Sequence, residues 1–226
     1  MKTFKLLFQL AIIWLPWAVR RPLLCAVLGF EIHPSAWIGK SLILPRRLFM
    51  AEGSRIGHGN FAHGLEEIRL ERFSSIGRLN WISGFPLGGA RYFKAFPDRS
   101  PRLHLEEHSR IVHRSMVDCT DTITIGRFTV LAGNRHQLMT HGIDLRTGNQ
   151  SCAPLSIGAY CLVGTGCIFL KGTALPDYCA LGAGSVVHKK NDRTHMLYSG
   201  TPAIAVRELD PDLAFFHRKI GASDSE

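Results

Sequence analysis

A six-residue periodicity between Ile157 and Val187 restricts the fold of this chain more than any other feature. Written in sixes from residue 157, the sequence reads IGAYCL, VGTGCI, FLKGTA, LPDYCA, LGAGSV and VHKKND, and every row begins with an apolar residue. An α-helix repeats every 3.6 residues and a strand every two, so neither element explains a period of six. The period predicts the coils of a parallel β-helix, and therefore an all-β fold.

Small residues recur at fixed places within these rows. Glycine holds the second place three times, at Gly158, Gly164 and Gly182. The fifth place is held by Cys161, Cys167, Thr173, Cys179 and Ser185. A backbone that turns a corner every six residues needs small side chains and conformational freedom at fixed positions. We therefore expect the fifth-place residues to be small buried side chains inside the coils.

Weaker copies of the repeat precede this region and set the domain organisation. An isoleucine stands before glycine at residues 38, 56, 76 and 125, which extends the predicted β-helix domain over residues 31–202. Interruptions near residues 84–102 and 137–155 predict loops, and loops of a solenoid often form its binding face. After Pro202 the pattern predicts a short helix over residues 203–219, followed by a polar tail to residue 226.

Residues 1–30 differ in composition from the rest of the chain. They contain four basic residues, no acidic residue and two apolar runs, residues 6–19 and 23–30. Both runs are shorter than the about 20 residues that cross a bilayer. Two compatible interpretations stay open. The segment is either an amphipathic helical element at a membrane interface, with Trp14 and Trp17 at the headgroups, or a helical cap over the open end of the β-helix.

Charge and cysteine content narrow the possible partners and compartment. The chain of 226 residues has a formal charge of +9, which favours a partner such as anionic lipid, nucleic acid or a phosphorylated cofactor. No aromatic-basic module supports nucleic-acid binding, so we expect none. The six cysteines include no CxxC pair, so we expect no metal site of that kind. They favour a reducing cytoplasmic setting, at the inner face of the cytoplasmic membrane if residues 1–30 bind lipid.

Several segments together resemble the hexapeptide-repeat acyltransferases, in particular the branch that O-acetylates sugars of bacterial surface polysaccharides. They are THGID (140–144), SIGAYCLVGTGCIFLKG (156–172), LGAGSVVHK (181–189) and SGTPAIAVREL (199–209). The resemblance covers about residues 31–210 and is dense from residue 123 onward. It implies a left-handed β-helix, a homotrimer, and acetyl-coenzyme A (acetyl-CoA) held between neighbouring subunits. The implied reaction moves an acetyl group to a hydroxyl of a small or lipid-linked sugar acceptor.

The resemblance places a catalytic base at His141, in the element Met139-Thr140-His141-Gly142. An alcohol is a poor nucleophile toward a thioester near neutral pH, and a histidine can remove its proton as the new bond forms. The implied transfer is direct, without an acyl-enzyme. His136 is the competing base, although it lies within a repeat row. Asp144 is a candidate for orienting the acceptor or the imidazole.

The resemblance also implies residues that bind acetyl-CoA, with the cations near its phosphates. They are Gly164, Thr165, Ala183, His188, Lys189 and Arg207. The backbone N–H of Gly164 is a candidate donor to the oxyanion. Arg91 and Tyr92, in the first predicted loop, are expected to form a wall for the acceptor, because aromatic faces suit sugar rings and cations suit a pyrophosphate. The alternative for this loop is an apolar cluster over the coils.

Departures from the family pattern leave the acceptor open. Leu162 stands where related enzymes often carry tryptophan, and residues 112–115 lack the asparagine of sugar-specific members. N-acylation of an amino sugar is therefore a second possibility. A zinc enzyme resembling the γ-class carbonic anhydrases is a third, based on His58 and His63 with His33 as a conceivable further ligand. A non-catalytic β-helix scaffold at a membrane is the fourth, although it gives the THGID loop no role.

Overall fold

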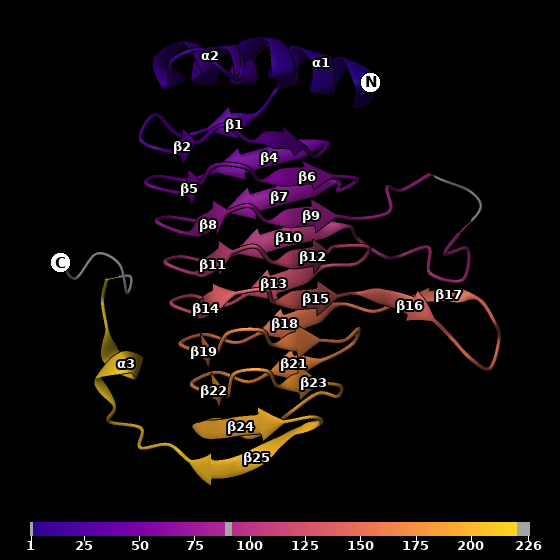
Figure 1. The fold of residues 1–226 in the computed structure, drawn as a ribbon, viewed down its shortest axis with the longest axis vertical. Coiled ribbons are helices and arrows are strands. Elements are labelled where there is room, and N and C mark those ends of the chain that lie inside the picture. The colour runs from indigo at the N-terminus through magenta and orange to yellow at the C-terminus, as the bar shows by residue number, and fades with distance from the viewer. Residues whose placement is uncertain (1, 89–91, 221–226) are drawn as a thin grey trace.

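The computed structural model describes residues 2–88 and 92–220, and most of them form stacked coils that pass through three short strands each (Figure 1). The strands make three parallel sheets, here named A, B and C, which the chain visits in that order in each coil. Strands of successive coils pair in register, for example Leu48 with Ile68 in sheet A. The winding is left-handed, so the predicted left-handed parallel β-helix is confirmed.

The strand bounds follow the coils along the chain. Sheet A contains β1 (Glu31–Ile32), β4 (Arg47–Met50), β7 (Glu67–Leu70), β10 (Arg102–Leu105), β13 (Ile123–Ile125), β18 (Leu155–Ile157) and β21 (Ala174–Leu175). Sheet B contains β2 (Trp37–Ile38), β5 (Arg55–Ile56), β8 (Ser75–Arg78), β11 (Arg110–His113), β14 (Val130–Asn134), β19 (Leu162–Val163), β22 (Ala180–Leu181), β24 (Met196–Gly200) and β25 (Ala203–Glu208). Sheet C contains β3 (Leu42–Leu44), β6 (Phe61–His63), β9 (Trp81–Ser83), β12 (Met116–Asp118), β15 (Gln137–Met139), β20 (Ile168–Phe169) and β23 (Val186–Val187).

The interior of the coils contains the side chains that the six-residue period selects. All six first-place residues from Ile157 to Val187 are at most 2% exposed, and the five fifth-place residues are at most 1% exposed. Neighbouring coils approach so closely that a Cβ on Gly164 would lie 2.6 Å from the backbone nitrogen of Ala183. The glycine at this turn is therefore required by the spacing of the coils. The prediction that the fifth-place residues are small and buried is confirmed.

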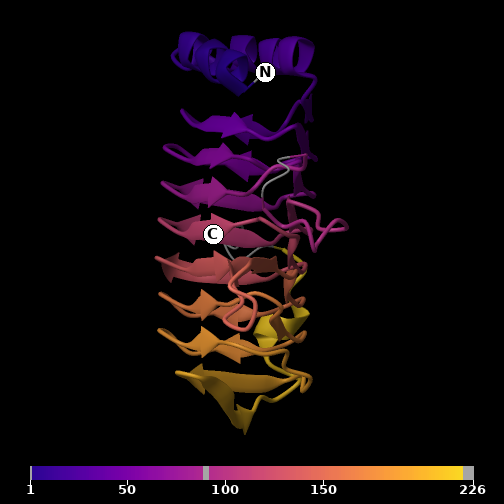
Figure 2. The same cartoon turned by 90° about the vertical axis from the view of Figure 1, so that its right-hand side faces the viewer.

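Two helices lie across the first coil, α1 (Lys2–Ile12) and α2 (Trp17–Leu28), as Figures 1 and 2 show. Gln9 of α1 fastens this layer to the sheet below: its Nε2 donates to the Ile43 carbonyl (2.6 Å) and its Oε1 accepts from the Ile43 N–H (2.9 Å). Among the described residues, the helices are too short or too polar to cross a bilayer. The chain then enters sheet A at Glu31.

The turns between sheets A and B, here called the A–B corner, carry a continuous stack of rings. Its members are Phe73, His108, Phe128, Tyr160, Tyr178 and His195, with consecutive ring centroids 4.7–5.3 Å apart. Each of the six has a positive φ of 52–58°, a conformation that costs free energy in residues with a side chain. The stack recurs at the same place in successive coils from β7 to β24 and supports the turn at each of these levels.

The C-terminal segment differs from its prediction. Residues 203–208 form β25, which pairs antiparallel with β24, and only Ala214–His217 (α3) are helical. The prediction of a helix from residue 203 was wrong because β24 is the last parallel strand and would otherwise expose an unpaired edge. Phe216 of α3 then packs edge-on against the rings of Tyr178 and His195, at 5.6 and 5.5 Å.

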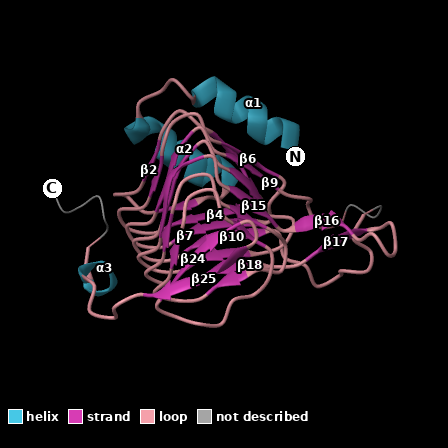
Figure 3. Ribbon diagram, turned by 60° about the horizontal axis from the view of Figure 1, so that its bottom comes forward, coloured by secondary structure: helices cyan, strands magenta, loops and turns pink. Residues whose placement is uncertain are grey.

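Both long insertions leave the coils where the chain passes from sheet C to sheet A, here called the C–A corner. The first comprises residues 84–101, between β9 and β10. The second comprises residues 140–154 and contains the antiparallel hairpin β16 (His141–Ile143) and β17 (Gln150–Cys152), which extends from the coils in Figure 3. This excursion starts later than the sequence suggests, because residues 137–139 are still a regular strand of sheet C.

Candidate active site

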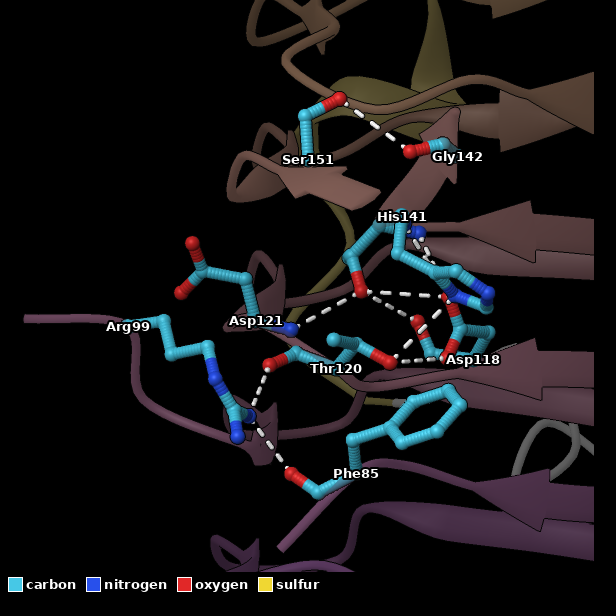
Figure 4. Close-up of polar contacts among 9 residues, drawn as sticks. Phe85, Arg99, Asp118, Thr120, Asp121, His141, Gly142 and Ser151 are labelled. Atoms are coloured by element: carbon cyan, nitrogen blue, oxygen red, sulfur yellow. Dashed lines mark hydrogen bonds and ion pairs between the residues drawn. The ribbon is translucent and has the colours of Figure 1, made fainter. Parts of the chain in front are cut away.

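His141 and Asp118 meet at the C–A corner. Asp118 is the last residue of β12 and lies in register with Met139 at the end of β15. The chain then turns out of the coil at Thr140, which sets His141 beside the carboxylate of the preceding coil. The imidazole Nδ1 lies 2.5 Å from Asp118 Oδ2 (Figure 4). The stacking of coils thus brings together two residues that are 23 positions apart.

The Asp118 carboxylate is held by several donors and is 6% exposed. Thr120 Oγ1 donates to Oδ1 at 2.7 Å, and the backbone N–H groups of Thr140 and His141 donate to Oδ2 at 3.1 and 3.2 Å. Burial acts to raise the pKa of this carboxyl, but the hydrogen bonds from His141 and Thr120 outweigh it and hold the pKa below its ordinary value. Asp118 is therefore ionised at neutral pH.

This arrangement fixes the tautomer of His141. An ionised carboxylate only accepts hydrogen bonds, so the proton of the neutral imidazole lies on Nδ1 and the lone pair on Nε2. Nε2 has no hydrogen-bond partner in the described part of the chain. The side chain is 25% exposed and lines a pocket of about 440 Å³. The nitrogen that can accept a proton is thus the one left for a ligand.

The first insertion forms one wall of this pocket. The rings of Phe85 and Phe93 stand nearly perpendicular to the imidazole, at 5.4 and 6.0 Å. Arg99 fastens the insertion to the coil: its guanidinium donates to the carbonyls of Phe85 (2.5 Å) and Thr120 (3.1 Å), and it lies 5.0 Å from the Phe93 ring. Trp81 and Met116 of sheet C, 49% and 53% exposed, supply a further apolar surface.

The predicted acceptor residues lie at different distances from His141. The ring of Tyr92 contacts the ring of Phe85 edge-on at 6.1 Å, and Phe85 in turn contacts the imidazole of His141. Arg91 lies outside the described residues. Asp144 is in the turn of the β16–β17 hairpin, where its Oδ1 accepts from the N–H groups of Arg146 (2.8 Å) and Thr147 (3.4 Å). The carboxylate of Asp144 therefore stabilises the hairpin turn.

The residues predicted to bind acetyl-CoA lie on three different parts of the chain's surface. His188 and Lys189 are exposed and follow β23, on the C–A corner that also carries His141. Gly164, Thr165 and Ala183 lie where the chain passes from sheet B to sheet C, here called the B–C corner. Arg207 is exposed on β25. The N–H of Gly164 donates to the Leu181 carbonyl (2.8 Å), so it is already engaged and does not serve as an oxyanion donor.

The competing histidines have other surroundings. His136 is fully buried with its Nε2 2.9 Å from the Ala132 carbonyl, and burial lowers its pKa. His33, His58 and His63 lie at the A–B corner, the B–C corner and the end of β6, so one chain does not gather them. Within residues 2–88 and 92–220, no group of three or more His, Cys, Asp or Glu side chains is arranged to hold a metal ion.

Sequence reasoning missed Asp118, Phe85 and Arg99. In the sequence, Asp118 comes after the apolar residues Met116 and Val117 and before Cys119. An acid in that position resembles an ordinary acidic residue of a turn. A register count from Leu138 back to Val117 would have found it, because these residues pair in adjacent coils. Phe85 and Arg99 lie within an irregular insertion, where no period predicts which side chains turn inward.

Comparisons with known proteins agree with this architecture. No protein-family model and no curated protein matches the chain. Among solved structures, the polysialic acid O-acetyltransferase OatWY aligns with a TM-score of 0.56 at 15% identity, over 79% of this chain and 84% of that chain. At this identity the similarity defines the fold.

Two further alignments have lower TM-scores. The N-acyltransferase AntD from Bacillus cereus aligns with a TM-score of 0.47 at 12% identity, over 84% of this chain and 86% of that chain. A hexapeptide-repeat acetyltransferase from Vibrio cholerae aligns with a TM-score of 0.41 at 17% identity, over 92% and 90% of the two chains.

Proposed function

We propose that this chain is an O-acetyltransferase that moves an acetyl group from acetyl-CoA to a hydroxyl of a sugar or polysaccharide precursor. The observation that carries the proposal is the contact between Asp118 and His141, which leaves Nε2 as a base facing a pocket. The shared fold with a polysaccharide O-acetyltransferase supports it. The exposed aromatic surface around Trp81 and Phe85 suits the apolar face of a sugar ring.

In the proposed reaction, His141 Nε2 removes the proton of the acceptor hydroxyl as its oxygen attacks the thioester carbonyl. The ionised Asp118 stabilises the resulting imidazolium and keeps the ring oriented. The tetrahedral intermediate collapses with cleavage of the carbon–sulfur bond. The proton on Nε2 passes to the departing sulfur, which leaves as the thiol of coenzyme A. No acyl-enzyme forms.

Acetyl-CoA binding is proposed at the boundary between two subunits of a homotrimer. His188 and Lys189 are exposed on the same corner as His141, where Lys189 can meet a phosphate as a cation and His188 can donate a hydrogen bond to it. Thr165 and Ala183 are exposed on the B–C corner, and Gly166 and Gly184 beside them have open space around the position of a Cβ. A pantetheine chain can approach the backbone closely there. Packing of one subunit's B–C corner against the neighbour's C–A corner would unite the two sets.

The test is acceptor-dependent release of coenzyme A thiol from acetyl-CoA, screened over neutral sugars, amino sugars and oligosaccharide precursors. We expect turnover with a hydroxyl acceptor that falls by at least a thousandfold in His141→Ala. His33→Ala, at an exposed histidine on another corner, is the matched control and should retain full activity. Turnover confined to amino sugars would establish the N-acyltransferase alternative, and undiminished turnover in His141→Ala would refute the assigned base.

A further inference from the structure

The helices α1 and α2 direct their polar side chains toward the β-helix. Lys5, Gln9 and Arg20 are at most 9% exposed, although they lie on a surface layer. Lys5 Nζ donates to the Pro45 carbonyl (2.8 Å) and Arg20 Nη2 to the Gly39 carbonyl (2.9 Å). Arg21 Nη2 donates to the Ile32 carbonyl at 2.7 Å. The usual arrangement of a surface helix, with its polar face outward, is reversed.

The first coil explains why polar groups point inward. It has no preceding coil, so its backbone groups lack the partners that every other coil receives from its neighbour. The side chains of Lys5, Gln9, Trp17, Arg20 and Arg21 supply hydrogen bonds to these groups. Capping accounts for the inner face of the two helices. It does not account for the outer face.

The outer face is apolar. Every side chain of residues 3–30 that is exposed is uncharged. The large hydrophobic side chains on this face are 41–76% exposed: Phe4, Leu7, Leu10, Trp14, Leu15, Val19 and Val27. Seven large apolar side chains exposed on two adjoining helices of a folded protein mark a contact with a partner or a membrane.

Charge at the same end indicates which occupant fits. Residues 1–47 contain seven basic residues and one acid, so they hold +6 of the chain's formal charge of +9. Arg46 and Arg47 pair with Glu66 and Glu67 of the next coil, and counting these two acids still leaves +4. Lys40 Nζ lies 3.9 Å from the centroid of the Trp14 ring, at the rim of the apolar face. The positive charge of this end, with Lys40 beside the apolar face, is complementary to an anionic bilayer, whereas a second copy would present like charge.

We propose that α1 and α2 dock this end of the β-helix on an anionic lipid bilayer, with the coils stacked away from the membrane. The apolar face enters the boundary between headgroups and acyl chains by about 5–10 Å. The polar inner face keeps its hydrogen bonds to the first coil throughout. The helices lie along the surface of the membrane and do not cross it.

This orientation has a consequence for the acceptor, which rests on the proposed function. His141 follows β15, four strand spacings from β3 in sheet C, so it lies about 19 Å beyond the first coil. A second cavity of about 380 Å³, lined by Lys5, Arg46 and Pro86, lies between the helices and the catalytic pocket. The two cavities adjoin through the consecutive residues Phe85 and Pro86. A saccharide of several sugar units, anchored by a lipid in the same membrane, fits this track along the C–A corner.

Docking is tested with the full chain and vesicles of phosphatidylcholine, with and without phosphatidylglycerol. We expect binding to the anionic vesicles and at least tenfold weaker binding by the triple variant Leu7→Gln, Leu10→Gln, Trp14→Gln. The control Ile204→Gln, Val206→Gln alters equally exposed apolar side chains on β25 at the other end and should bind like wild type. Circular dichroism should show the same melting temperature for both variants as for wild type, so that a loss of binding does not reflect unfolding. Hydrogen exchange should slow in residues 3–29 on vesicle addition and stay unchanged in residues 196–208.

Three results would overturn the docking proposal: no binding to anionic vesicles, equal binding by the triple variant, or assembly into larger oligomers through this face without vesicle binding. The last would identify a second copy as the occupant. His141→Ala should bind vesicles normally, which separates docking from catalysis. With a lipid-linked saccharide in vesicles, wild type should acetylate at least tenfold faster than the triple variant, while both act equally on a soluble acceptor. Equal rates on both acceptors would refute the lipid-linked class.

Discussion

The A–B corner and the C–A corner are turns of the same coils, yet they use their side chains in opposite ways. At the A–B corner six rings stack on one another, with centroids 4.7–5.3 Å apart. Each of these rings packs against a ring of a neighbouring coil. At the C–A corner the chain leaves twice, over residues 84–101 and 140–154, and returns with Phe85 and His141 around a pocket. Regular turns stabilise the coils, and interrupted turns place side chains around a pocket.

The difference predicts that stability and activity respond to different corners. The residues of the ring stack have positive φ and are supported by the rings above and below them. The proposed catalytic pair, Asp118 and His141, is instead joined by hydrogen bonds between two coils. Substitutions at the two corners can therefore be compared by unfolding and by turnover in parallel.

After His141→Ala, the largest effect is expected for Asp118→Asn. The amide keeps the shape of the side chain but loses the charge that holds the proton on Nδ1, so kcat should fall by about a hundredfold or more. Asp121→Asn is the matched control three residues away, because the amide oxygen can still accept from the N–H of Thr122. Its kcat should stay within a factor of two. A similar loss in both variants would mean that the corner has merely been disrupted.

At the other corner, Tyr160→Ala should lower the free energy of unfolding by about 2 kcal/mol, because it removes two stacked ring pairs. Tyr160→Gly should cost about 1 kcal/mol less, since glycine tolerates the φ of 55° at this turn. Urea unfolding measures both. The activity of the folded variants should equal that of wild type. A large loss of kcat would contradict the idea that the A–B corner contributes to stability and not to activity.

The pH dependence of the free energy of unfolding should reveal the contribution of Asp118 at the C–A corner. The folded-state pKa of Asp118 lies below its unfolded value of about 3.9, so its stabilising contribution is complete above that value and is lost as the pH falls toward the folded-state pKa. Urea unfolding between pH 6 and pH 3 should therefore show a steeper loss for wild type than for Asp118→Asn. Parallel curves would show that Asp118 gains nothing from its partners in the folded state.

The smallest effect is expected for Asp144→Asn, at the tip of the second insertion. An amide oxygen can still accept from the N–H of Arg146, so the hairpin turn should survive. Acetyl transfer should change by less than about twofold, which initial rates at low acceptor concentration would measure. A tenfold rise in KM for the acceptor would instead place this carboxylate in the acceptor site.

Sequence reasoning reached the coils but only part of the site. The interior of residues 157–187 was predictable because each side chain's direction follows from its place in a period. His141 was found through a family resemblance, since nothing local distinguishes it from other histidines. Asp118 escaped because its partner lies one coil away, beyond a turn whose length the sequence does not reveal. The strand at residues 203–208 escaped for a similar reason, because its conformation depends on pairing with the edge of β24.

The most direct test of the proposed catalytic pair is a double-variant cycle on acceptor-dependent thiol release. If Asp118 acts through His141, adding Asp118→Asn to His141→Ala should leave the residual rate unchanged within a factor of about two, although Asp118→Asn alone costs about a hundredfold. A further hundredfold fall in the double variant, so that the two losses multiply, would contradict a shared role for Asp118 and His141.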